Sequence, residues 1–84
     1  ATLVEPYLIV ISEPSEVFAL FQHEGVEFIY ILKGEMVYRH GSRLYPMSEG
    51  DSLYFDADTP HGPEELGKLP IRFLSFIVEP QSDS

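Results

Sequence analysis

The chain has 84 residues, of which 44% are hydrophobic and 23% are charged, and it contains no cysteine. This length and composition favour one small globular domain and exclude a second independent core, a disulfide framework, a thiolate metal site and a cysteine nucleophile. The formal net charge of -9, from 14 acidic and 5 basic residues, disfavours direct binding of this segment to the phosphates of DNA or RNA.

Short apolar runs, separated by glycine, proline and polar residues, follow one another along the chain. The runs that we predict as strands are residues 6–11, 17–21, 28–32, 35–39, 44–47, 52–55 and 71–78. Residues 62–69 are predicted to be the one long loop, and Lys33-Gly34 and His40-Gly41 are predicted hairpin turns. Strands with this spacing are typical of an all-β sandwich or barrel.

Two histidines and one glutamate are the candidate metal ligands. His23 and Glu27 are four residues apart, so an extended backbone would place both side chains on one face. His61 follows a proline turn, and a closed barrel can bring inward side chains of remote strands together. Two imidazoles and one carboxylate on one face would match the triad that binds Fe(II) with open positions, and the same set could hold Mn, Ni, Zn or Cu.

Each of these residues also has an ordinary structural interpretation. His23 could be a rim histidine with a structural hydrogen bond, and His61 could line a pocket and hydrogen-bond a ligand. Glu27 could instead pair with an arginine, because a buried unpaired carboxylate is costly. The candidate partners of Glu27 are Arg39, Arg43 and Arg72. His40, in a predicted turn, is expected at the surface.

Residues 23–35, with the sequence HEGVEFIYILKGE, resemble the first motif of the cupin superfamily, G-x5-H-x-H-x3,4-E-x6-G. His23 matches the second histidine of that motif, Glu27 its glutamate and Gly34 its closing glycine. The resemblance therefore implies that His23 and Glu27 are metal ligands.

The second cupin motif, G-x5-P-x-G-x2-H-x3-N, is matched by Gly50 and His61. The resemblance covers about residues 5–79 and implies a single domain of residues 1–84. It implies a double-stranded β-helix, the cupin or jelly-roll barrel, with His61 as a third ligand of one divalent ion such as Fe, Mn, Ni or Zn.

The chain departs from the cupin pattern at several positions. Phe21 occupies the place of the first histidine, so one of the four family ligands is absent, and Ser15 replaces the opening glycine. In the second motif the proline, the second glycine and the asparagine are replaced by Asp56, Asp58 and Glu65. The three remaining ligands are still a workable set for Fe(II).

Residues 23–30, 50–56 and 59–61 are similar to the cupin domain that follows a helix-turn-helix domain in XRE-type bacterial regulators. This implies the C-terminal sensor part of a longer cytoplasmic regulator, whose DNA-binding domain would precede Ala1. No apolar run approaches the ~20 residues that cross a membrane, so no membrane segment is expected.

A small molecule is the expected ligand of this sensor. The residues predicted to line its pocket are Phe21, Met36, Tyr38 and Arg72. One alternative is a metal-dependent enzyme, such as a small dioxygenase or isomerase that uses the two histidines and the glutamate. Another is a metal-free dimerisation module. Few additional acids or bases are expected in the pocket, which disfavours the enzyme.

The strand at residues 28–32 has two apolar faces. Glu27, Ile29 and Ile31 would share one face, and Phe28, Tyr30 and Leu32 would share the other. Since both faces of such a strand must be covered, we predict a homodimer or a packed neighbouring domain on the outer face.

Overall fold

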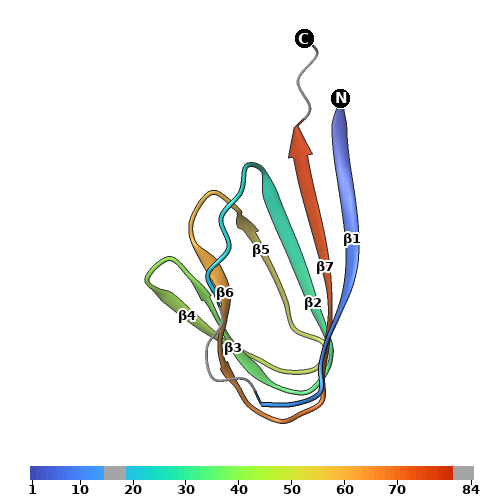
Figure 1. The fold of residues 1–84 in the computed structure, drawn as a ribbon, viewed down its shortest axis with the longest axis vertical. Helices are drawn as coiled ribbons and strands as arrows, with labels where there is room; N and C mark the ends of the chain where they lie inside the picture. The colour runs from blue at the N-terminus through green and yellow to red at the C-terminus, as the bar shows by residue number, and fades with distance from the viewer. Residues whose placement is uncertain (15–18, 81–84) are drawn as a thin grey trace.

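Seven β-strands form the regular structure of residues 1–14 and 19–80, the parts of the chain that the computed structural model describes. In chain order the strands are β1 (Thr2–Ile11), β2 (Val26–Lys33), β3 (Met36–His40), β4 (Arg43–Met47), β5 (Ser52–Asp56), β6 (His61–Leu66) and β7 (Ile71–Pro80) (Figure 1). The predicted all-β class is confirmed. A search of the same residues finds no helix of the length and apolarity that a membrane span requires.

The strands form two antiparallel sheets. One sheet has the order β1-β7-β2-β5, and the other has the order β4-β3-β6 (Figure 1). The C-terminal strand β7 lies between β1 and β2 and pairs with both, so neighbours in the sheet are remote in sequence. This arrangement is the jelly-roll, or double-stranded β-helix, that the cupin resemblance implied.

The hydrophobic core lies on the inner faces of the two sheets. Its buried members are Ile29, Ile31, Met36, Tyr38, Met47, Phe55, Ile71 and Phe73. Along β2, Glu27, Ile29 and Ile31 are buried, whereas Tyr30 and Leu32 are exposed on the other face. The predicted alternation is thus confirmed, and it places one carboxylate among apolar side chains.

The prediction of a loop at residues 62–69 is wrong. Residues 61–66 form β6, which pairs with β3 through the partners Tyr38–Pro63 and Arg39–Gly62. Glycine, proline and glutamate have low strand propensity, which is why the segment has the composition of a loop. Because β6 is an edge strand, Pro63 needs no ladder partner on one side and is tolerated there.

Two other local predictions need correction. The hairpin at His40-Gly41 is confirmed, since it joins the paired strands β3 and β4, but Lys33-Gly34 connects strands of different sheets. Of the predicted strand at residues 17–21, residues 17 and 18 lie outside the described residues. Phe21 forms only an isolated bridge with His61. Close packing requires a glycine at position 34, because a Cβ there would lie 2.6 Å from two backbone oxygens.

Candidate metal centre

Three side chains from separate parts of the chain converge inside the barrel. His23 precedes β2, Glu27 lies on the inner face of β2, and His61 begins β6. One ligand atom from each of the three residues lies within 4.8 Å of the others. Glu27 is 6% exposed and His61 is 1% exposed, so the group is largely withdrawn from water.

Backbone pairing holds His23 and His61 in place. Phe21 and His61 exchange two backbone hydrogen bonds, with N–O distances of 2.7 and 2.9 Å. The amide of His23 donates to the Ala57 carbonyl at 2.9 Å. The segment before β2 is therefore fastened to the start of β6 and to the turn before it, although about 40 residues separate these segments in the sequence.

Gly25 makes the bend that brings His23 back over Glu27. Its φ is 101°, in the region that glycine adopts without steric cost. A Cβ at this position would lie 2.1 Å from the carbonyl oxygen of Val78. A glycine is therefore required at position 25 for two reasons, the backbone conformation and the close approach of β7.

Hydrogen bonds to backbone carbonyls determine which ring nitrogen of each histidine carries a proton. Nδ1 of His61 donates to the Thr59 carbonyl at 2.9 Å, and Nδ1 of His23 donates to the Glu24 carbonyl at 3.1 Å. A carbonyl oxygen can only accept, so the proton of each neutral ring is on Nδ1 and Nε2 keeps its lone pair. Partners of this kind orient histidines that bind metals through the other nitrogen.

Both Nε2 atoms point to the same carboxylate oxygen. Oε1 of Glu27 lies 3.1 Å from Nε2 of His23 and 3.2 Å from Nε2 of His61. Within the described residues, the buried Nε2 of His61 has no hydrogen-bond partner. Three electron-rich atoms that face one another in a buried site require a shared cation, either a proton or a metal ion. The donor set therefore fits a divalent metal.

Two hydroxyl side chains surround the Glu27 carboxylate. Ser75 on β7 donates its Oγ hydrogen to Oε2 of Glu27 at 3.1 Å, which leaves Oε1 for the two imidazoles. Burial, together with the Glu27 charge, raises the pKa of the Tyr38 hydroxyl well above its usual range, so Tyr38 remains a proton donor at neutral pH. Ser75 is a site residue that the sequence analysis missed.

The pKa of His23 reflects opposing effects. Partial burial lowers it, but the hydrogen bond to the Glu24 carbonyl and the charge of Glu27 outweigh burial and raise the pKa above its usual 6.5. His23 also lies 3.7 Å from a carboxylate oxygen of Glu79. Without a metal, the surroundings of His23 therefore favour its protonated form.

The alternative in which an arginine neutralises Glu27 finds no support among the described residues. Arg39 instead forms a two-pronged ion pair with Glu64, with both N–O distances at 2.8 Å. The other candidate partners, Arg43 and Arg72, are exposed. His40, expected at the surface, is half-buried, and its Nε2 donates to the Asp56 carbonyl at 2.9 Å.

A cavity of about 440 Å³ opens beside the three side chains. It is lined by Tyr7, Ile9, Ile11, Phe21, His23, Glu27, Tyr38, Pro63, Phe73, Ser75 and Ile77. Of the four predicted pocket residues, Phe21 and Tyr38 line this cavity. Arg72 lies on the exposed face of β7 and does not.

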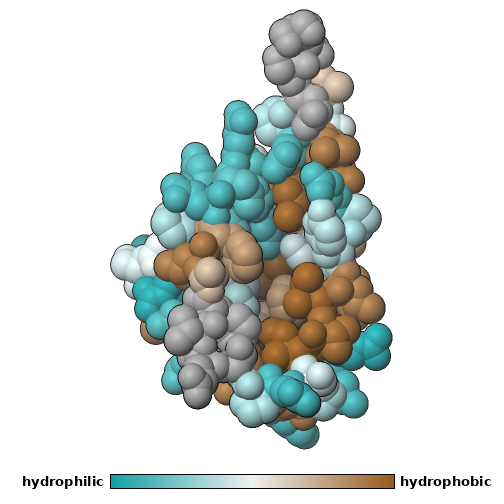
Figure 2. Space-filling view, viewed as in Figure 1, coloured by the Kyte–Doolittle hydropathy of each residue, from teal (hydrophilic) through white to brown (hydrophobic). Residues whose placement is uncertain are grey.

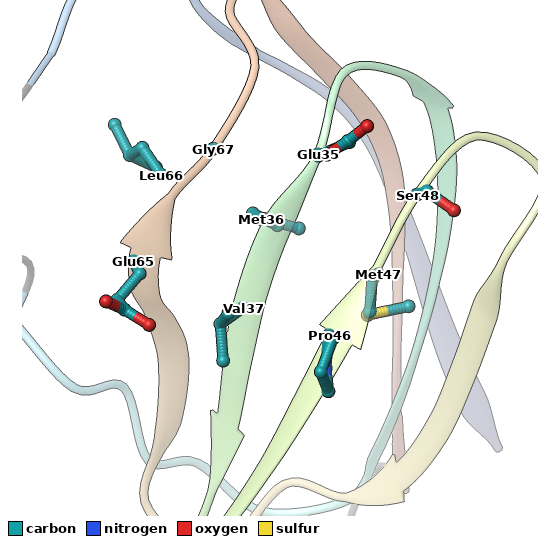
Figure 3. A pocket seen from close by; sticks show the side chains of 9 residues that line it. All are labelled: Glu35, Met36, Val37, Pro46, Met47, Ser48, Glu65, Leu66 and Gly67. Atoms are coloured by element: carbon teal, nitrogen blue, oxygen red, sulfur yellow. The ribbon is translucent and has the colours of Figure 1, made fainter.

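Met36, the fourth predicted pocket residue, lines a different cavity. This second cavity, of about 370 Å³, lies around the ends of β3, β4 and β6, where Met36 and Met47 are seen in Figure 3. Met36 pairs with Leu66, at the end of β6 opposite to His61. Met36 and Tyr38 share the inner face of β3, but only Tyr38 is near the candidate centre.

Comparisons with known proteins identify a matching family and proteins of similar fold. The family described as "Cupin domain" matches residues 8–77. An oxalate-binding protein of Thermotoga maritima is 33% identical over 66 residues, which cover 77% of this chain and 54% of that protein. The chain thus spans about half the length of this curated relative.

Two solved structures have a similar fold. A predicted oxalate decarboxylase from Thermotoga maritima superposes with a TM-score of 0.76 at 30% identity, over 89% of this chain and 65% of the other. The cupin domain of an XRE-family transcriptional regulator from Enterobacter cloacae superposes with a TM-score of 0.74 at 18% identity. That match covers 98% of this chain and 99% of the other.

Proposed function

We propose that this chain, which belongs to the cupin family, is a small-molecule-binding domain built around one divalent metal ion. His23, Glu27 and His61 would hold the ion. The observation that carries the proposal is the convergence of two imidazole Nε2 atoms on one buried carboxylate oxygen, with one Nε2 lacking any other partner among the described residues. Fe, Mn, Ni and Zn all accept this set of two nitrogens and one oxygen.

The chain's own residues would prepare the centre for a ligand. The Thr59 and Glu24 carbonyls orient the imidazoles, and Ser75 holds the second oxygen of Glu27. When bound, the metal supplies a Lewis acid with coordination positions left open for a small molecule. The neighbouring cavity gives that molecule room, and similarity to an oxalate-binding protein supports a small-molecule ligand.

We favour a sensor over a catalyst because the cavity offers little for acid–base chemistry. Apart from His23 and Glu27, the polar side chains that line it are, among the described residues, Tyr7, Tyr38 and Ser75. Ser75 bonds to Glu27, and the pKa of Tyr38 is too high for it to act as a base near neutral pH. On this proposal the chain is the C-terminal part of a cytoplasmic transcriptional regulator, and ligand binding shifts the regulator between two states.

The proposed sensor would act as a homodimer through the outer face of its larger sheet. Register places Phe28 beside Phe76 and Tyr54, and Leu74 beside Leu8 and Tyr30. These two rows, which also include Pro6 and Ser52, contain no charge. Two chains that each carry a charge of -9 repel, so these two rows, which contain no carboxylate, are where two copies can approach. Large exposed apolar patches commonly mark such interfaces.

Metal analysis tests the centre. Protein purified without a metal-chelating tag should contain about one divalent ion per chain, and Glu27→Ala should lose it. Glu65→Ala is the matched control, because Glu65 is an exposed carboxylate on β6 outside the group of three. Unchanged metal content in Glu27→Ala, or equal losses in both variants, would reject the assignment.

A second candidate function is an Fe(II)-dependent enzyme, and the three-residue donor set is the observation that favours it. Three protein ligands leave room for both a substrate and dioxygen at the metal. Oxygen consumption by Fe(II)-loaded protein with candidate substrates tests this function. Consumption that depends on His61 would favour the enzyme over the sensor.

A further inference from the structure

The walls of the cavity beside the candidate centre are apolar. Beyond the candidate ligands, most of its lining comes from the inner faces of β1 and β7. The aliphatic and aromatic side chains there are Ile9, Ile11, Phe73 and Ile77. Figure 2 shows hydrophobic side chains gathered around a hollow near the middle of the face in view.

Among the residues that the structure describes, no lysine or arginine lines this cavity. Arg39 is paired with Glu64, and Arg72 lies on the exposed face of β7. A small dianion would therefore have only the metal to balance its charge. The rest of such a ligand's surroundings would be hydrocarbon, in a chain whose net charge is already -9.

The cavity is also larger than a small chelating anion needs. Its volume of about 440 Å³ lies within the ~300–1,000 Å³ of sites that bury drug-sized ligands. A ligand that contacted only the metal would leave most of the apolar wall against water.

The mouth of the cavity has the same apolar character. Phe21 and Tyr7 both line the cavity although they are 56% and 44% exposed, so they lie at its opening. Phe21 stands where the cupin motif has a histidine, and it replaces a polar ligand with an aromatic ring. A ligand with an apolar body would cover both rings on entering.

We infer that the ligand of this domain is amphipathic, with a chelating head at the metal and an alkyl or aryl body against β1 and β7. This inference rests on the proposed metal centre and specifies the class of molecule that the centre binds. It sets the chain apart from a site for oxalate alone, which has no apolar body to bury.

A series of ligands with one head group and increasing tails tests the inference. We would measure the binding of malonate, ethylmalonate, butylmalonate and hexylmalonate to Ni²⁺-loaded protein by calorimetry. Since the dicarboxylate head is constant, each buried methylene should lower Kd about fourfold. With partial burial of the tail, hexylmalonate should bind at least about 100-fold more tightly than malonate. Values of Kd within about threefold across the series would overturn the inference.

A pair of variants at neighbouring positions of β1 tests whether the ligand tail lies against the β1 wall of the cavity. Ile9→Thr should weaken the dependence of Kd on tail length, because Ile9 lines the cavity. Val10→Thr should leave that dependence unchanged, because Val10 is exposed on the opposite face. An equal dependence of Kd on tail length in both variants would contradict the placement of the tail against β1.

Metal content, measured on the same samples, distinguishes failure of the proposed metal centre from failure of the proposed ligand class. Protein that holds no Ni²⁺ would refute the proposed centre, and the ligand class would fall with it. Protein that holds Ni²⁺ but binds all the malonates equally would refute only the amphipathic ligand.

Discussion

Nε2 of His61 lies 3.2 Å from Oε1 of Glu27, and it has no hydrogen-bond donor among the described residues. Its Nδ1 hydrogen is already donated to the Thr59 carbonyl. A neutral His61 therefore presents a lone pair to a carboxylate inside the barrel. This pairing costs free energy unless a cation lies between the two residues. The metal-free protein should consequently be less stable than the metal-bound one.

Adding a divalent metal should raise the melting temperature of the protein. At a free metal concentration 100 times Kd, binding to the folded state contributes ~2.7 kcal/mol. For a domain of this size that gain corresponds to roughly 10–20 °C. Differential scanning calorimetry with and without Ni²⁺ would measure the shift.

The matched variants for this experiment are His61→Ala and His40→Ala. The first should abolish the metal-dependent shift, and the second should retain it, because His40 does not belong to the group of three. A metal-dependent shift that persists in His61→Ala would place the ion elsewhere.

The stability of the metal-free protein should fall as pH rises above about 6.5. Burial lowers the pKa of His23, but the Glu24 carbonyl and the Glu27 carboxylate raise it above 6.5 overall. A group whose pKa is raised by folding stabilises the folded state fully at pH values below its pKa in the unfolded chain. That stabilisation is lost as the pH rises through its pKa in the folded protein. Urea unfolding of metal-free protein between about pH 5.5 and pH 8.5 would follow this loss.

The contribution of His23 is isolated by difference. Subtracting the profile of His23→Gln from that of the native chain should leave a stabilisation that declines with rising pH. Metal affinity should change in the opposite direction, because a metal binds only the neutral imidazole. A flat difference profile would mean that the Glu24 carbonyl and the Glu27 carboxylate do not stabilise the protonated form of His23 in the folded protein.

Gly25→Ala should destabilise both the fold and the centre. The new Cβ would overlap the Val78 carbonyl at 2.1 Å, and the φ of 101° would strain any side chain. We expect a loss of roughly 3–4 kcal/mol in the free energy of unfolding. Gly50→Ala is the control, because Gly50 has a φ of 88° but no atom within 4 Å of its Cβ position.

Gly50→Ala should therefore show only conformational strain, of roughly 1–2 kcal/mol. Urea denaturation measures both losses, and metal titration of the folded fraction reports on the centre. Equal losses in the two variants would mean that the contact of Gly25 with β7 contributes nothing.

Local sequence patterns predicted the three converging side chains because each fell within a short motif. His23 and Glu27 lie one bend apart at Gly25, and His61 follows a proline turn. The partners that orient these side chains could not be predicted, since the Thr59 carbonyl and the Ser75 hydroxyl meet them only after the sheets form. A serine at an inward position of β7, between Phe73 and Ile77, was the available signal for Ser75.

Two errors have physical explanations. Arg72 was expected in the pocket. Alternation along β7 places it on the outer face instead, between the inward-facing Ile71 and Phe73. β6 was predicted as a loop because its propensities are low. Its pairing with β3 is a tertiary effect that overrides local preference at the edge of a sheet.

The outer face of the larger sheet should hold two copies together. Tyr30→Lys would place a charge in the middle of the uncharged rows, beside Leu74, and should shift the protein to a monomer. Leu44→Lys adds the same charge at an exposed apolar residue of the other sheet and should leave the dimer intact. Sedimentation equilibrium distinguishes the two masses. A native chain that is monomeric at micromolar concentration, or a dimer that persists in Tyr30→Lys, would contradict this interface.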